Sequence, residues 1–169
     1  MNRVTFKFVA PLALASLVAA CGAEFGPEDD GDGFGSSYRD ESVDVSFATL
    51  HQSAYLESGL EHDRTFQVFT DHESYEDELI NYTSDQAQTV DFKENQVVLF
   101  DMGSRSSTGF SISLMDVSEA DDVVTLEINY VRPGGDCSVT TTDTNPWVMF
   151  RIESTNEVVL QESFSDLDC

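Results

Sequence analysis

Apolar and polar residues alternate through much of the second half of this chain. The alternation covers residues 110–114 and 124–130. A period of two is typical of a strand that packs on one face and meets water on the other. Val97-Val98-Leu99-Phe100 is instead a continuous apolar run, which predicts a central strand covered on both faces. Two more strands are predicted over 147–152 and 158–164, joined by a tight turn at 154–156.

The first half predicts two short strands and one helix. Apolar residues alternate over 43–47 and over 65–70, where Phe66, Val68 and Thr70 are expected on one face. Residues 74–77 resemble a capping box, and an apolar stripe follows at Tyr75, Leu79 and Tyr82. So short a helix must pack on a sheet to be stable. We predict a mainly β, α+β fold: an antiparallel sheet or sandwich with one helix, in a single domain over 43–169.

Strand parity predicts where the loops meet. If the five strands after the helix run up and down in turn, loops 103–109 and 132–146 emerge at one end, and the chain terminus lies there too. Cys137 and Cys169 would then share one rim. The third cysteine of the chain, Cys21, follows an apolar amino-terminal stretch typical of a lipoprotein signal. If its thiol is acylated, the other two cysteines remain as a pair in an oxidising compartment. We therefore expect a disulfide between Cys137 and Cys169.

The amino terminus has the layout of a secretory signal over residues 1–20. Arg3 and Lys7 precede an apolar stretch that is too short to span a bilayer, and small residues lead to Cys21. A cysteine at the cleavage point resembles a lipoprotein signal, in which the thiol is acylated before cleavage. Two or three acyl chains on Cys21 would anchor the protein to the membrane. The alternative is an ordinary secretory signal with a chance cysteine.

The expected location is the bacterial cell envelope, with the lipid anchor in the outer membrane. Gly22, which follows the cysteine, resembles the pattern of outer-membrane sorting. Residues 21–42 are rich in glycine and acids and poor in large apolar residues, which predicts a flexible tether. Asp29, Asp30 and Asp32 do not complete a calcium-loop pattern, so we predict no metal and no cofactor.

The chain is strongly acidic. It has 8 basic and 32 acidic residues, and cleavage after residue 20 would remove two basic residues and no acidic ones, leaving a net charge of −26. Such a chain repels phosphate backbones, which excludes nucleic acid as a partner. The acidic excess either steers basic partners toward the protein or keeps it soluble in a saline habitat, and we favour the second interpretation.

Catalytic groups are sparse. His51, His62 and His72 all precede the β-rich half. His62-Asp63 and Asp71-His72 are sequence neighbours, which point to opposite faces of a strand. The sequence has no zinc-ligand spacing, phosphate-binding loop or nucleophile elbow. We therefore predict a protein-binding module and not an enzyme.

Four short motifs lie beside the predicted strands. They are Asp91-Phe92 before the apolar run 97–100, Thr108-Gly109-Phe110, Arg132-Pro133-Gly134-Gly135, and Thr144-Asn145-Pro146-Trp147. Over residues 66–152 the pattern resembles the C-terminal domain of the PrcB family, named for an accessory subunit of a spirochaete surface protease complex. The family usually has two glycines where this chain has Gly109 alone, and Tyr is commoner at Trp147. The resemblance implies a β-rich domain that binds an envelope or secreted protease, or another envelope protein.

The same loops resemble, more loosely, those of chagasin-type protease inhibitors. These β-sandwiches wedge three loops into a protease cleft, and the corresponding segments here are 103–110, 132–136 and 144–147, with Trp147 as an exposed anchor. The alternative is that the glycines make turns and Trp147 is half-buried core. The candidate protein-binding residues are Arg105, Ser107, Thr108, Gly109, Phe110, Arg132, Gly134, Gly135, Asn145, Pro146 and Trp147.

Overall fold

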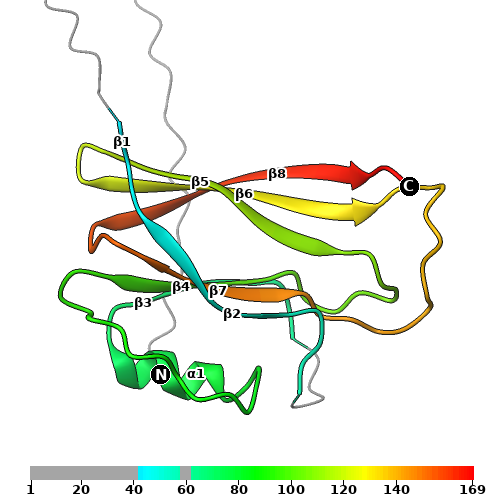
Figure 1. Ribbon diagram of the computed structural model, residues 1–169, viewed down its shortest axis with the longest axis horizontal. Coiled ribbons are helices and arrows are strands. Elements are labelled where there is room, and N and C mark those ends of the chain that lie inside the picture. Colours follow the sequence, from blue (N-terminus) through cyan, green and yellow to red (C-terminus); the bar gives the residue numbers. More distant parts are fainter. Residues whose placement is uncertain (1–41, 58–61) are drawn as a thin grey trace, which may run out of the picture. The chain divides into compact units, whose positions relative to one another are not determined.

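The computed structural model describes residues 42–57 and 62–169, which form two sheets and one helix (Figure 1). The predicted signal peptide, Cys21 and all but the last residue of the predicted tether lie outside these residues. Among the described residues, no helix has the length and apolar character needed to cross a membrane. The elements are β1 (Val43–Asp44), β2 (Phe47–Ser53), β3 (Thr65–Phe69), α1 (His72–Leu79), β4 (Gln96–Asp101), β5 (Ser111–Ala120), β6 (Val123–Pro133), β7 (Trp147–Ile152) and β8 (Glu157–Leu167).

The strands divide into two sheets of four. Sheet A has the order β1-β5-β6-β8, and sheet B has the order β2-β7-β4-β3. One hydrophobic core lies between them, because alternate residues of β6 in sheet A and of β4 and β7 in sheet B are buried in the same cluster. The predicted α+β, mainly β fold is confirmed, and it is a sandwich.

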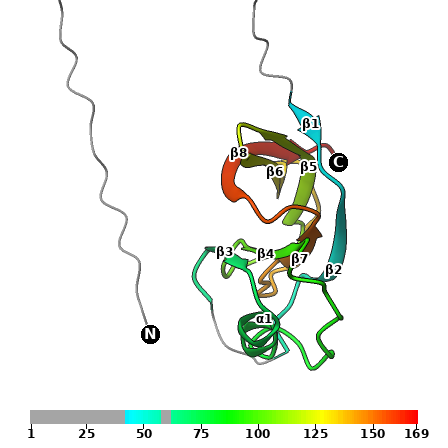
Figure 2. The ribbon, with the colours of Figure 1, turned by 90° about the vertical axis from the view of Figure 1, so that its left-hand side faces the viewer.

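Sheet B is covered on its second face by the helix, so the domain has three layers (Figure 2). Tyr75, Leu79 and Tyr82 are at most 1% exposed and pack against Val97 and Leu99 of β4. Every residue of β4 is buried. The continuous apolar run therefore predicted its position correctly, because each face of this strand meets an apolar layer.

The helix begins earlier than the capping-box pattern indicated. Asp71 is the N-cap, and its carboxylate accepts a hydrogen bond from the Ser74 backbone N–H at 2.8 Å. Ser74 therefore lies in the first turn. An aspartate cap satisfies the unpaired first-turn amide as well as the predicted serine would, so the local pattern alone did not distinguish the two.

The predicted strand over 43–47 is two strands in different sheets. The Val45 amide donates to the Val117 carbonyl of β5 at 2.8 Å, and the Ser46 carbonyl accepts from the Glu153 amide at 2.9 Å. The chain thus passes from sheet A to sheet B at this point. Alternation predicts an extended backbone but not the partner of each half.

β6 and β8 are parallel, which differs from the predicted antiparallel sheet. Their register runs without a break from Val123 opposite Glu157 to Pro133 opposite Leu167. β7 lies between them in sequence but belongs to sheet B. β6 and β8 run in the same direction because β7, which runs in the opposite direction, separates them in sequence. The predicted alternation of strand direction is therefore correct, but β8 pairs with β6 and not with β7.

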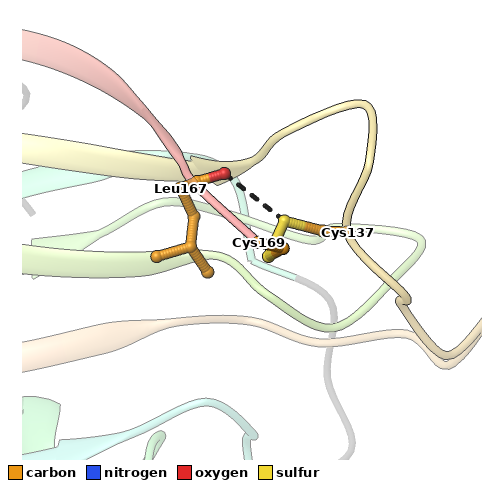
Figure 3. The surroundings of a disulfide bond; sticks show 3 residues. All are labelled: Cys137, Leu167 and Cys169. Carbon is orange, nitrogen blue, oxygen red and sulfur yellow. Dashed lines mark hydrogen bonds between the residues drawn. A yellow bond between two sulfur atoms is a disulfide. The ribbon is translucent and has the colours of Figure 1, made fainter.

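A disulfide joins Cys137 to Cys169, as predicted (Figure 3). The Cα atoms are 5.0 Å apart, within the range that a disulfide spans. The Gly134 amide also donates to the Leu167 carbonyl at 3.2 Å. The end of β8 is thereby fixed to the loop that follows β6.

Removal of the disulfide should lower the stability of the domain. The cysteines are 32 residues apart, and a loop of this length predicts a loss of about 4 kcal/mol in the free energy of unfolding. Urea denaturation of a Cys137→Ser/Cys169→Ser double variant should show it, with oxidised wild type as reference. An unchanged midpoint would mean that the crosslink does not constrain the unfolded chain.

Candidate functional site

Two loops lie side by side at the end of the sandwich that holds the disulfide. We call residues 103–110 and 132–146 the loop rim. Arg105 and Thr144 exchange two backbone hydrogen bonds of 2.7 and 2.8 Å, and the Thr108 amide donates to the Thr140 carbonyl at 3.0 Å. The Thr144 hydroxyl donates to the Ser107 carbonyl at 2.8 Å. The structure therefore brings together the loops that strand parity placed at one end.

A buried carboxylate holds the base of this rim. Asp101 ends β4 and is 0% exposed. Its Oδ1 accepts from the Gly103 amide at 2.7 Å and from Asn145 Nδ2 at 2.5 Å, and its Oδ2 accepts from the Tyr82 hydroxyl at 3.0 Å. His62 Nδ1 lies 3.6 Å from the same Oδ2. One side chain thus links both rim loops, the segment after the helix and the approach to β3.

The groups around Asp101 are suited to donate to a carboxylate. Burial, followed by the nearby negative charge of Asp101, raises the pKa of the Tyr82 phenol, so this hydroxyl keeps its proton. The His62 ring packs edge-on against Tyr82, with 4.7 Å between ring centroids. Hydrogen bonds from several donors compensate for the removal of the carboxylate from water.

Gly103 is required by the same arrangement. Its φ is +73°, and a Cβ there would lie 2.8 Å from the Arg64 backbone nitrogen. Any other residue would be strained in this conformation and would also collide with the neighbouring chain. The glycine lets loop 103–110 turn back tightly enough for its amide to reach Asp101.

The motif at 144–147 faces inward. Asn145 is 5% exposed and Trp147 is 3% exposed, and Pro146 is also buried. Trp147 packs on Tyr82 with 5.0 Å between ring centroids, and its indole N–H donates to the Tyr55 carbonyl at 3.1 Å. Of the two interpretations, the one with Trp147 in the core is therefore supported and the exposed anchor is wrong, since this side chain packs between sheet B and the helix.

The other candidate residues lie at or near the rim surface. The Arg105 guanidinium lies 5.7 Å from the Phe110 ring centroid, and Arg132 forms an ion pair with Asp166 at 2.9 Å. A Cβ on Gly109 would approach Pro133 to 3.0 Å, whereas one on Gly135 would meet nothing within 4 Å. Ser107, Thr108 and Gly134 are partly exposed. Gly135 alone of these glycines leaves open space beside its backbone.

A further cluster of side chains, centred on Arg64, was not predicted from the sequence. The Arg64 guanidinium lies 4.5 Å from the Tyr130 ring centroid and 5.8 Å from that of Phe164, and it pairs with Glu162. The Tyr130 hydroxyl donates to Glu162 at 3.0 Å, and burial raises the pKa of this phenol. Arg64 thus connects the start of β3 to sheet A. A lone arginine before a short strand gives no sequence signal for such a contact.

The described residues contain no group of three or more His, Cys, Asp or Glu side chains that could hold a metal ion. His51 donates to or accepts from the Tyr75 hydroxyl at 2.9 Å, and burial lowers the pKa of its imidazole. This histidine joins sheet B to the helix, which is a structural contact.

Replacement of Asp101 by alanine should destabilise the domain severely. The change leaves the Tyr82 hydroxyl, the Gly103 amide and Asn145 without their acceptor, at a cost of about 3 kcal/mol or more. Chemical denaturation measures this loss in the free energy of unfolding. Asp116→Ala is the matched control, because this partly exposed aspartate lies opposite Glu127 and its loss should change stability by less than about 0.5 kcal/mol. Equal stabilities of the two variants would contradict the role given to Asp101.

Comparison with known proteins identifies one family. Residues 96–153 match the family model described as PrcB C-terminal. No curated protein and no solved structure shows significant similarity to the chain. The matched segment begins at the first residue of β4 and ends just after β7, so it contains Asp101, both loops of the rim and the 144–147 motif. The resemblance seen in the sequence is confirmed over residues 96–153, which match the model of the PrcB C-terminal family.

Proposed function

We propose that this chain is a lipid-anchored protein of the bacterial cell envelope that binds a secreted or surface protease as its accessory subunit or partner. The match of residues 96–153 to the PrcB C-terminal family carries the proposal. Acylation of Cys21, predicted from the signal at the amino terminus, supplies the anchor.

The geometry of the domain favours the loop rim as the surface that meets the partner. Val43, where the described chain enters sheet A, pairs with Glu119 near the turn between β5 and β6. The rim follows the opposite end of β6. A partner at the rim would therefore approach the domain at the end away from Val43.

Binding without inhibition fits the rim better than a chagasin-like mechanism. An inhibitor of that type needs protruding side chains on its loops, and Asn145, Pro146 and Trp147 are buried. The surface that remains is mostly polar, with Val139 as its exposed large apolar side chain at 43% and Phe110 only partly exposed. Such a surface suits an accessory contact, because it has no fully exposed aromatic anchor of the kind found in a tight inhibitory interface.

Photo-crosslinking in the native bacterium tests the protease partner. A photoreactive residue at Val139 should capture a secreted or surface protease identifiable by mass spectrometry. The same residue at Ile80, which is 66% exposed beside the helix, is the control and should capture much less. Recovery of partners that include no protease would overturn the proposal, and so would equal capture at both positions.

The lipid anchor is tested separately. Wild-type protein should incorporate an alkyne-labelled fatty acid and fractionate with membranes, because acyl chains on Cys21 bury their methylenes in the bilayer. A Cys21→Ser variant should lose the label and move to the soluble fraction. Persistent membrane association of that variant without the label would show that something other than acylation holds the protein there.

A further inference from the structure

β8 has the longest unpaired strand edge in the described part of the chain. It has 11 residues and lies at one border of sheet A, with β6 as its only neighbour among the described strands (Figure 2). The other border strands are shorter: β1 has 2 residues, β2 has 7 and β3 has 5. An unpaired edge presents a row of N–H and C=O groups to any strand that approaches it.

The hydrogen bonds show which groups of β8 point outward. The Leu167 carbonyl accepts from the Gly134 amide, so the backbone groups of Leu167 face β6. Successive residues of a strand turn their backbone groups to opposite sides. Within residues 42–57 and 62–169, no backbone hydrogen bond beyond the β6 pairing involves the residues on the other side. The residues whose backbone N–H and C=O groups point away from β6 are Val158, Leu160, Glu162, Phe164 and Asp166.

This edge lacks four common kinds of protection. Proteins block exposed edges with short strands, proline, lysine or bulges. β1 and β3 are short, and β2 has a bulge between Thr49 and His51. β8 contains no proline, lysine or arginine, and its register with β6 is unbroken over all 11 residues. Of its acids, Glu162 pairs with Arg64 and Asp166 pairs with Arg132. Glu157 has no ion pair among the described residues, and it would repel a second copy of the same edge and attract a basic segment.

The two sides of β8 would meet different side chains of an added strand. Toward the sandwich lie Val158, Leu160 and Phe164, and Phe164 is 57% exposed and stacks on Tyr130. Toward the outer face of sheet A, Gln161 continues a row in which Asp116 lies directly opposite Glu127. Like charges opposite one another are unfavourable, and a cation beside that row relieves their repulsion.

We propose that β8 accepts an extended segment of the partner protein by strand addition, and that basic and apolar residues alternate in this segment. The apolar side chains would cover Val158, Leu160 and Phe164, and the basic ones would lie beside the acidic outer row. A second copy of β8 is a poor occupant, since it would bring acids against acids in a chain of net charge −24. The acidic residues 21–41 are poor occupants for the same reason.

Peptide binding to the oxidised mature protein tests the site itself. The probe is a synthetic peptide of about ten residues that alternates lysine with valine, and the control alternates glutamate with valine. On addition of the lysine peptide, hydrogen exchange at the five outward amides should slow by roughly tenfold or more, because they gain acceptors. Unchanged exchange at these amides would overturn the proposal, even if the peptide binds elsewhere.

A pair of variants at one position separates strand addition from other binding. Phe164→Ala removes the ring and keeps the outward N–H, whereas Phe164→Pro removes both. The proline variant should bind the lysine peptide about tenfold more weakly than the alanine variant, which is a difference of about 1.4 kcal/mol. Equal affinities would exclude the backbone contact. If Phe164→Pro does not fold, Asp166→Pro and Asp166→Ala, near the end of the strand, give the same comparison.

The identity of the partner rests on the proposed function and can fail independently. If wild-type protein and Phe164→Pro capture the protease equally well in the crosslinking experiment, the β8 site is wrong and the protease partner stands. If the lysine peptide protects the outward amides and no protease is recovered, strand addition stands and the protease partner is wrong.

Discussion

Asp101 is a fully buried carboxylate that accepts hydrogen bonds from three separate parts of the chain. Its two carboxylate oxygens accept hydrogen bonds from Gly103 at the start of one rim loop, from Asn145 at the end of the other, and from Tyr82 after the helix. A buried charge is tolerated only where donors of this kind surround it. The position of both rim loops, and with them the surface offered to a partner, therefore depends on this one side chain.

The three layers determine which surfaces remain free. Sheet B lies between sheet A and the helix, so both of its faces are covered. Sheet A has one core face and one outer face, and within residues 42–57 and 62–169 the edge of its last strand, β8, is unpaired. The disulfide attaches the end of this edge strand to the loop rim. The rim and the β8 edge are thus adjoining surfaces, and one extended partner can contact both.

The family match and the structure agree on the part of the chain that matters for this site. Residues 96–153 include the central strand β4, the hairpin β5–β6 and the central strand β7. The 144–147 motif within this segment supports the core: Trp147 packs on Tyr82, and Asn145 donates to Asp101. A short motif at a strand end can therefore mark a structural contact as readily as a binding loop.

Local pattern by itself predicted most of the secondary structure, because burial on one face or two leaves a period in the order of apolar residues. The continuous run at 97–100, the alternation at 124–130 and the stripe from Tyr75 to Tyr82 each correspond to an element of the structure. Strand parity and the number of cysteines also predicted the Cys137–Cys169 bond.

Only the tertiary structure decided which strands became neighbours, whether Trp147 faced inward, and which acids met a donor or a like charge. Asp101 and Asp116 look alike in sequence, yet one is buried in the rim and the other lies opposite Glu127 on the outer face of sheet A. These outcomes depend on contacts between residues far apart in the chain, and the spacing of apolar residues within one element does not predict such contacts.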